Sequence, residues 1–306
     1  MSAASLRLAT RGSPLALWQA ETAARVLRAA FADLEVTLVT VRSGGDADTH
    51  TPLAAFGRTG IFTAEVDRTL LQGDADAAVH SLKDMTTTLE AGIVLAAVLP
   101  RGPVEDALAG AALADLSAGA RVATGSARRR AMLLRARPDL ACVAIRGNVG
   151  TRLAKLDAGE AEALLVARAG LVRLGLEQRI AEVLDTERFL PAVGQGAIGL
   201  TCRADDGETL ERLRAVCDSA TRAAVEAERA FLAVLRGGCN VPVGAHARVE
   251  PDGGLHLTAQ VLARDGSRTL AGERRAAPDE AAAAGRALAE ELLGRGAAEL
   301  LAEARR

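Results

Sequence analysis

Arginine recurs in this sequence at the ends of predicted strands and helical turns, at Arg11, Arg128, Arg129, Arg130, Arg146, Arg152 and Arg173. In doubly wound α/β sheets, ligands bind outside the carboxyl ends of the strands. The planar guanidinium group binds a carboxylate through two parallel hydrogen bonds. Any one of these arginines is also compatible with a solvated helix start. Their recurrence after strands favours a site for a ligand that carries several carboxylates.

A cation and a carboxylate, Lys83 and Asp84, follow another predicted strand at residues 75–79. Asp84 is placed to act as a general acid or to hold a developing positive charge, with Lys83 binding an anion beside it. The same pair is also typical of a capped helix start. The local sequence does not separate these two interpretations.

Cys239 differs from the other three cysteines, which lie in apolar segments typical of buried, inert thiols. It lies in the glycine-rich segment 236–244, after a predicted helix that carries Arg229 and Arg236. This setting makes it a candidate nucleophile or covalent attachment point. The four cysteines show no C-x-x-C spacing and the four histidines no ligand spacing, so we expect neither a disulfide framework nor a metal site. A reduced, cytoplasmic protein fits this pattern.

The segment 194–199, Gly-Gln-Gly-Ala-Ile-Gly, matches the dinucleotide-binding pattern G-x-G-x-x-G. That site requires a strand before the glycines and a helix after them, whereas here a strand is predicted after them. The sequence also has no phosphate-binding G-x-x-x-x-G-K-[ST] motif. Nucleotide binding is therefore disfavoured.

Composition excludes several further classes of partner. The 306 residues include 37 Lys and Arg against 39 Asp and Glu, so the chain is not basic throughout. Aromatic residues are only 2% of the chain, with no Tyr and one Trp, which argues against base-stacking platforms and a nucleic-acid partner. Arg7 and Arg11 precede any long apolar run, and no apolar stretch reaches 18 residues, so we expect no signal peptide and no membrane span.

The elements that must position the candidate residues alternate between strand and helix in two successive stretches. The first has predicted strands at 6–10, 36–41, 75–79 and 93–99, a helix from Pro14 capped by Ser13, and a helix from Thr63 to Gln72. The second has predicted strands at 121–123, 142–145 and 163–167, a helix from Ser126 and another at 149–157. Such alternation predicts α/β domains with mostly parallel sheets and helices on both faces.

The pattern changes in the last third of the chain. A predicted strand at 197–202 is placed to return to the first sheet. From residue 218, a long helix to 235, three strands near 243–249, 255–263 and 269–275, and Ala-rich helices in two pieces indicate a smaller α+β domain with an antiparallel sheet. We therefore predict domain 1 at 1–99 and 193–216, domain 2 at 100–192 and domain 3 at 217–306.

Five segments of the chain resemble the hydroxymethylbilane synthase family, also called the porphobilinogen deaminase family. They are LRLATRGSPLALWQA from Leu6, DAAVHSLKD from Asp76, PDLACVAIRGNVGTRLAKLDAGE from Pro138, LPAVGQGAIGLTCR from Leu190 and GGCNVPVGAHA from Gly237. They occur in the same order as in the family, and the resemblance extends over nearly the whole length of the chain. Five long motifs in order make a chance similarity very improbable.

The resemblance implies a transferase that joins four porphobilinogen molecules head to tail, releases ammonia and frees hydroxymethylbilane by hydrolysis. It implies two doubly wound domains similar to type II periplasmic binding proteins, with the active site in the cleft between them. The third domain would carry a dipyrromethane cofactor, joined to Cys239 by a thioether. A monomer with porphobilinogen as its small-molecule partner is expected, with neither nucleic acid nor membrane as a partner.

The resemblance also assigns roles by motif position. Asp84 would be the catalytic residue, assisting the loss of ammonia and stabilising the azafulvenium cation. Cofactor binding is implied for Cys239, Lys83, Asp84, Thr124, Ser126, Arg128, Arg129 and Arg146. Substrate binding is implied for Arg11, Ser13, Arg146, Arg152, Arg173 and Gln195. No metal is implied.

The chain departs from the family pattern at a few positions. Ala55, Arg58 and Thr59 stand in a loop that usually carries lysines, Met85-Thr86 replaces Val-Pro after the aspartate, and Gly125 replaces a serine. Two rival functions remain open from the residues alone. A non-catalytic anion-binding protein would need neither Cys239 nor Asp84. A cysteine hydrolase would need a histidine partner for Cys239, and no histidine has an evident position for that role.

Overall fold

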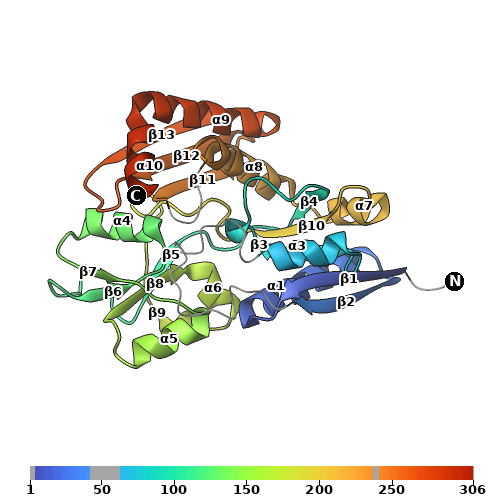
Figure 1. The fold of residues 1–306 in the computed structure, drawn as a ribbon, viewed down its shortest axis with the longest axis horizontal. Helices are drawn as coiled ribbons and strands as arrows, with labels where there is room; N and C mark the ends of the chain where they lie inside the picture. The colour runs from blue at the N-terminus through green and yellow to red at the C-terminus, as the bar shows by residue number, and fades with distance from the viewer. Residues whose placement is uncertain (1–3, 42–62, 237–240, 306) are drawn as a thin grey trace. The chain divides into compact units, whose positions relative to one another are not determined.

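The computed structural model describes residues 4–41, 63–236 and 241–305. The described chain forms two compact units. The first unit comprises residues 4–41, 63–102 and 196–222, and the second comprises 103–195, 223–236 and 241–305. Figure 1 follows the chain through both units by colour.

The first unit is built on a five-stranded sheet in the order β2-β1-β3-β10-β4. Its strands are β1 (Ala4–Arg11), β2 (Leu34–Val41), β3 (Ala77–Ser81), β4 (Ile93–Val98) and β10 (Ile198–Arg203). β1 runs parallel to β2 and β3, whereas β10 runs antiparallel to β3 and β4. The predicted return of the chain to the first sheet is thereby confirmed.

Alternation of side chains along β1 divides the core of the first unit between the two faces of the sheet. Leu6 and Leu8 pack with α1 (Pro14–Ala30) and α7 (Gly207–Ala215). Ala9 points to the other face and packs with Val66 and Leu70 of α3 (Ala64–Leu71). Successive strand residues point to opposite faces, so each face needs its own helices. The doubly wound arrangement follows from that requirement.

The second unit contains another five-stranded sheet, in the order β7-β6-β8-β5-β9. Its strands are β5 (Asp106–Ala109), β6 (Arg121–Ala123), β7 (Ala141–Val143), β8 (Ala163–Ala167) and β9 (Ile180–Val183). β6 runs parallel to β7 and β8, and β5 runs antiparallel to β8 and β9. Its helices are α4 (Ala127–Ala136), α5 (Val149–Asp157) and α6 (Arg168–Arg173). Ala131, Met132 and Leu133 of α4 belong to one core cluster, whereas Leu153 and Leu156 of α5 and Leu171 of α6 belong to another.

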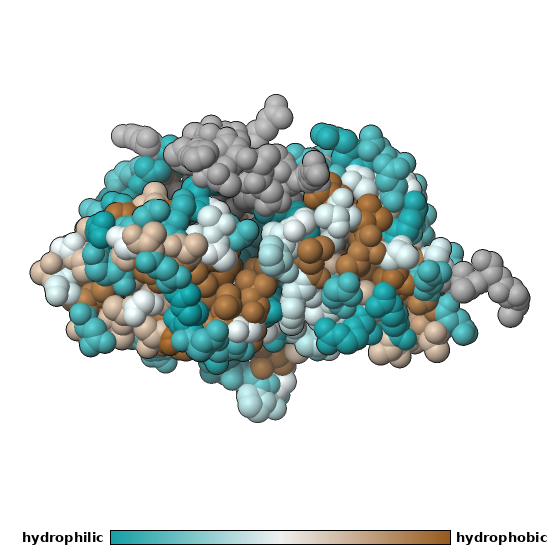
Figure 2. Space-filling view, turned by 90° about the horizontal axis from the view of Figure 1, so that it is seen from below, coloured by the Kyte–Doolittle hydropathy of each residue, from teal (hydrophilic) through white to brown (hydrophobic). Residues whose placement is uncertain are grey.

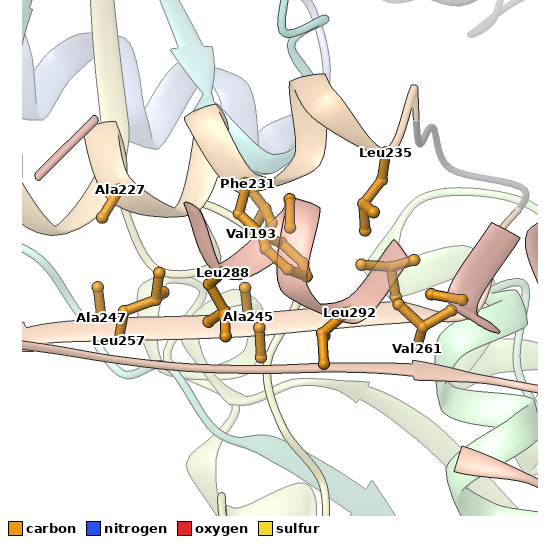
Figure 3. Close-up of a cluster of buried hydrophobic side chains, with 14 of the residues drawn as sticks. Val193, Ala227, Phe231, Leu235, Ala245, Ala247, Leu257, Val261, Leu288 and Leu292 are labelled. Atoms are coloured by element: carbon orange, nitrogen blue, oxygen red, sulfur yellow. The ribbon is translucent and has the colours of Figure 1, made fainter. Parts of the chain in front are cut away.

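The C-terminal part of the chain packs helices on a three-stranded antiparallel sheet. It consists of α8 (Ser219–Val234), β11 (Val243–Val249), β12 (Leu255–Leu262), β13 (Thr269–Ala276), α9 (Ala281–Leu292) and α10 (Ala298–Arg305). Phe231, Leu288, Ala245 and Ala247 belong to one buried cluster, which Figure 3 shows between the helices and the strands. A Cβ atom at Gly285 of α9 would lie 2.1 Å from the carbonyl oxygen of Ala227, so glycine permits the close approach of α9 to α8.

The predicted α/β class with a C-terminal antiparallel sheet is confirmed. The Ala-rich end is in two pieces as predicted, separated by the segment Leu293–Ala297, in which Gly296 has a φ of 101°. The second unit contains both the predicted domain 2 and most of the predicted domain 3. The division into three domains stays a prediction.

Several strands differ from the prediction. β1 and β2 each begin two residues earlier than predicted, and β7 ends at Val143 rather than at residue 145. β3 begins at Ala77 rather than at residue 75, because the amide of Ala75 donates to the carbonyl of Thr69 in the turn after α3. At its other end, β3 includes His80 and Ser81, which were predicted to follow the strand. β5 and β9, of four residues each, were not predicted at all.

The face drawn in Figure 2 mixes hydrophilic and hydrophobic residues. Within the described part of the chain, the large hydrophobic side chains that are exposed are Trp18, Leu71 and Val183, one each on α1, α3 and β9. None of the described helices has the length and apolar character needed to span a membrane.

Candidate functional site

The carboxyl ends of β1 and β3 bring several candidate residues of the first unit to one edge of its sheet. β1 ends at Arg11, and Ser13 caps the following helix by accepting a hydrogen bond from the amide of Ala16 at 3.3 Å. Because β1 and β3 are parallel neighbours, both strands end at the same edge. Burial, and then the positive charge of Arg11, lower the pKa of His80 near the end of β3 to about 4. Arg11 therefore lies close enough to β3 for its positive charge to affect the protonation of His80.

Lys83 and Asp84 lie in a single 3₁₀ turn, Leu82–Asp84, directly after β3. The turn is held from two sides. The amide of Leu82 donates to the carbonyl of Ala197 at 3.1 Å, and Ser81 exchanges hydrogen bonds with the side chain of Gln19 in α1 at 2.9 and 3.0 Å. No helix follows the turn before β4, so the alternative of a capped helix start is wrong.

The carboxylate of Asp84 is half-buried and makes no hydrogen bond or ion pair with any described residue. Behind it, Leu82 and Met85 pack over Gly199 of β10. A Cβ atom at position 199 would lie 2.9 Å from Cδ1 of Leu82 and 3.3 Å from Sδ of Met85. The turn is thus fixed by its backbone and its apolar neighbours and not by the carboxylate.

In the second unit, three parallel strands end at one edge and deliver candidate residues there. Thr124 and Ser126 follow β6, Arg146 follows β7, and α6 after β8 ends at Arg173. Ser126 caps α4 by accepting from the amide of Arg129 at 3.4 Å. The strand-end pattern predicted from the sequence is present in both sheets.

Arg128 and Arg129 lie in the first turn of α4, and both are buried, with 3% and 6% of their surface exposed. Arg128 Nη1 donates to Oδ2 of Asp106 and to the carbonyl of Leu190, both at 2.7 Å. Arg129 Nε donates to Oδ1 of Asp106 at 2.9 Å, and its Nη2 donates to Oε1 of Gln195 at 3.2 Å. Gln195 completes the cluster by donating to Oδ1 of Asp106 at 2.9 Å. These two arginines are therefore not solvated helix starts.

The charges in this cluster act strongly on one another. Burial alone would raise the pKa of Asp106, but the charges and hydrogen bonds of Arg128 and Arg129 outweigh it and hold that pKa well below its usual range. Burial lowers the pKa of Arg128, an effect that Asp106 opposes and Arg129 reinforces. The carboxylate therefore stays ionised across the physiological range.

The remaining candidate arginines of the second unit are half-buried. Arg152 Nε donates to the carbonyl of Gly147 at 2.8 Å, where the backbone takes a φ of 112°. Burial lowers the pKa of Arg173 to about 10, so it remains a cation at neutral pH. Contacts of these arginines with a ligand stay a prediction, as does a direct contact of the fully buried Gln195 with substrate.

Other sequence predictions concern Cys239 and the positions Ala55, Arg58 and Thr59, which lie outside the described residues. The described cysteines, Cys142, Cys202 and Cys217, are free thiols. In the described ranges no three His, Cys, Asp or Glu side chains are grouped so that they could hold a metal ion.

Asp106 is the site residue that sequence reasoning missed. The register of β5 with β8 places Asp106 opposite Ala167, the last residue of β8. An antiparallel strand therefore brings its first residue to the edge where the parallel strands end. The available signal was an aspartate that opens the apolar run Ala107-Leu108-Ala109. The dinucleotide alternative does not match the fold, because β10 follows the glycines at 194 and 196.

Comparison with known proteins shows two family matches. The family described as "Porphobilinogen deaminase, dipyromethane cofactor binding domain" matches residues 6–211. The family described as "Porphobilinogen deaminase, C-terminal domain" matches residues 222–294.

Curated relatives match over nearly their whole length. A porphobilinogen deaminase of Xanthomonas euvesicatoria pv. vesicatoria (strain 85-10) is 47% identical over 302 residues, 98% of this chain and 99% of that protein. One of Xanthomonas campestris pv. campestris (strain B100) is 48% identical with the same coverage. Among solved structures, a TRAP periplasmic solute binding protein from Desulfovibrio salexigens is similar at 13% identity and a TM-score of 0.43, covering 70% of this chain and 72% of that one.

Proposed function

The chain belongs to the porphobilinogen deaminase family, and from that premise we propose how its own residues carry out the reaction. The enzyme is a transferase of tetrapyrrole biosynthesis. It joins four porphobilinogen molecules head to tail, and with one water molecule it yields hydroxymethylbilane and four ammonia molecules. The observation that carries this conclusion is the match of relatives at 47% and 48% identity over 98% of the chain.

The residues present fit a dipyrromethane cofactor. Each of its two pyrrole rings carries an acetate and a propionate, so the group needs cationic, fork-shaped donors. The buried cluster offers two guanidinium groups against one carboxylate, and Nε of Arg128 is buried without a hydrogen-bond partner in the structure. Lys83, Thr124, Ser126, Arg128, Arg129 and Arg146 are the residues proposed to hold it, with Cys239 as its covalent anchor. When bound, this cofactor supplies the free pyrrole α-carbon on which the product is built.

Asp84 is proposed as the catalytic residue. As the aminomethyl group of porphobilinogen leaves as ammonia, positive charge develops on the pyrrole, and a carboxylate beside it stabilises that charge. The carboxylate of Asp84 suits this role because no described residue binds it. The turn that carries Asp84 is held by the hydrogen bond from the amide of Leu82 to the carbonyl of Ala197, so little reorganisation is needed. The same carboxylate hydrogen-bonds the pyrrole N–H of the incoming ring.

The substrate carboxylates are proposed to bind Arg11, Ser13, Arg146, Arg152 and Arg173. Each guanidinium can hold one carboxylate by two hydrogen bonds. Repeated use of this contact suits a chain of identical rings, since every new ring brings one acetate and one propionate.

We further propose that the enzyme works as a cytoplasmic monomer in three domains. The described cysteines are free thiols, as expected in a reducing compartment. Light scattering of the purified chain should give the mass of one copy, and a stable dimer would contradict the monomer.

Reaction stoichiometry tests the proposed function. Purified enzyme is incubated with porphobilinogen, the reaction is quenched, and porphobilinogen, ammonia and hydroxymethylbilane are measured. We expect four porphobilinogen molecules consumed and four ammonia molecules released for each hydroxymethylbilane. Porphobilinogen that binds without releasing ammonia would instead favour the non-catalytic anion-binding protein.

A further inference from the structure

Asp106 is the residue around which two arginines of the second unit are organised. Its side chain is fully buried at the start of β5, and both of its oxygens are used. Oδ2 accepts from Arg128, and Oδ1 accepts from Arg129 and from Gln195. The four side chains come from β5, from α4 and from the segment before β10. Through the carboxylate of Asp106, hydrogen bonds therefore connect three separate parts of the second unit.

The hydrogen bonds of Arg129 leave one of its nitrogens for another partner. Nε and Nη2 both lie within hydrogen-bonding distance of Oδ1 of Asp106, at 2.9 and 2.8 Å, and Nη2 also reaches Gln195. Nη1 makes no hydrogen bond with any residue that the structure describes, and 8% of the side-chain surface is exposed. Contacts on one side of a planar guanidinium fix the orientation of the whole group. Asp106 and Gln195 thus orient the nitrogen that remains for an anion.

Asp106 also sets the charge of the cluster. Two guanidinium groups and one carboxylate leave one net positive charge among side chains that are at most 8% exposed. Without the carboxylate, two buried like charges would lie side by side, which is strongly unfavourable. A buried cluster with one net positive charge suits one carboxylate of a ligand.

We propose that Asp106 is a positioning residue that fixes the orientation of Arg129 and, by cancelling one of two buried positive charges, prepares the cluster to accept one pyrrole carboxylate. The inference rests on the proposed function, which supplies ligands bearing acetate and propionate groups. Asp106 acts through the arginines and does not itself contact the ligand.

Asp106→Asn tests this role because it keeps the shape of the side chain and removes its charge. The full-length chain is produced without porphobilinogen and then titrated with porphobilinogen at several ionic strengths. Intact mass spectrometry gives the concentration at which half of the protein carries the cofactor. In the variant this half-loading concentration should rise more steeply with ionic strength than in the wild type, with a slope up to about twofold larger. The attraction between the cluster and a ligand carboxylate scales with the product of their charges, and the substitution raises the net charge of the cluster from one to two.

Asp139→Asn is the matched control. It also removes one carboxylate from an Arg–Asp pair of the second unit, the 2.7 Å pair with Arg137. That pair lies beyond the other end of the 10-residue helix α4, about 15 Å along the helix axis. This control should keep the wild-type slope. An unchanged slope in Asp106→Asn would overturn the proposal, because a purely structural role lowers stability without altering charge dependence.

A charge-compensated double variant keeps the test decisive if Asp106→Asn folds poorly. Arg128→Gln should lower the melting temperature of the wild type, since it removes a partner of Asp106. In the Asp106→Asn background it should raise the melting temperature, because it removes one of the two buried positive charges left without a counter-ion. A double variant that melts no higher than Asp106→Asn would also overturn the proposal. Wild-type protein that never acquires the cofactor would contradict the proposed function itself, which separates the two failures.

Discussion

His80 is buried in β3, close to the turn Leu82–Asp84 that carries Asp84. Its burial predicts that the protein loses a defined amount of stability in acid. His80 is 6% exposed, its Nε2 lies 3.1 Å from Oγ1 of Thr201, and its pKa is lowered from 6.5 to about 4 by burial and by Arg11. Well above pH 6.5 the histidine is neutral in both the folded and the unfolded state. As the pH falls from 6.5 towards 4, the unfolded state gains a proton that the folded state does not, so the free energy of unfolding falls.

The size of the effect follows from the two pKa values. The difference between 6.5 and about 4 corresponds to a loss of about 3 kcal/mol by pH 4. The chain has one tryptophan, Trp18, which lies on α1 of the first unit. Urea unfolding followed by its fluorescence therefore reports on the unit that contains His80. The measurement is repeated between pH 4 and pH 8, with His80→Gln beside the wild type.

His80→Gln should be less stable at pH 7 but should lose much less stability between pH 6.5 and pH 4. His256→Gln, in the second unit, is the control and should follow the wild-type curve as reported by Trp18. If the wild type and His80→Gln lost stability in parallel over this range, a neutral buried His80 would be the wrong explanation.

Three further predictions concern the two units. Gly199→Ala should lower the free energy of unfolding in urea by about 1–3 kcal/mol and should also lower turnover. The reason is that the new Cβ atom would lie only 2.9 Å from Cδ1 of Leu82 and would shift the turn Leu82–Asp84. Unchanged turnover would show that the turn tolerates the shift. Asp84→Asn should lower turnover by at least about 100-fold while leaving the melting temperature unchanged, since the carboxylate makes no hydrogen bond or ion pair with described residues. Wild-type turnover would remove Asp84 from the mechanism. Replacing Arg152 or Arg173 by Gln should stall extension of the pyrrole chain without preventing cofactor attachment. Intact mass spectrometry of reaction mixtures should then show enzyme that carries partial products. A loss of the cofactor itself would contradict this division of roles.

Local patterns in the sequence were sufficient to locate much of the framework. The bounds of β6, α5 and β8 agree with the prediction at both ends, and Ser13 and Ser126 cap their helices as expected. These features depend on side-chain periodicity and on capping groups that are close in sequence. The arginine pattern after strands was visible for the same reason, because parallel strands share one edge.

Features that depend on tertiary pairing were not visible. β5 and β9 are short, and they are strands because β5 pairs with β8 on one side and with β9 on the other. The partnership of Asp106 with Arg128 and Arg129 follows from that antiparallel register, and no local pattern encodes it. The burial of both arginines could not be predicted either, since arginine is usually exposed unless it is paired. The local sequence indicated candidate chemistry for Cys239 and Asp84, and the family resemblance implied their specific roles.

Intact mass spectrometry of the full-length protein tests the central claim most directly. Wild-type protein exposed to porphobilinogen should be heavier than its sequence by one dipyrromethane group, and Cys239→Ser treated in the same way should have the mass of its sequence. A folded wild-type protein that stays unmodified after exposure, or a Cys239→Ser variant that still carries the group, would contradict a transferase that builds its product on a cofactor anchored at Cys239.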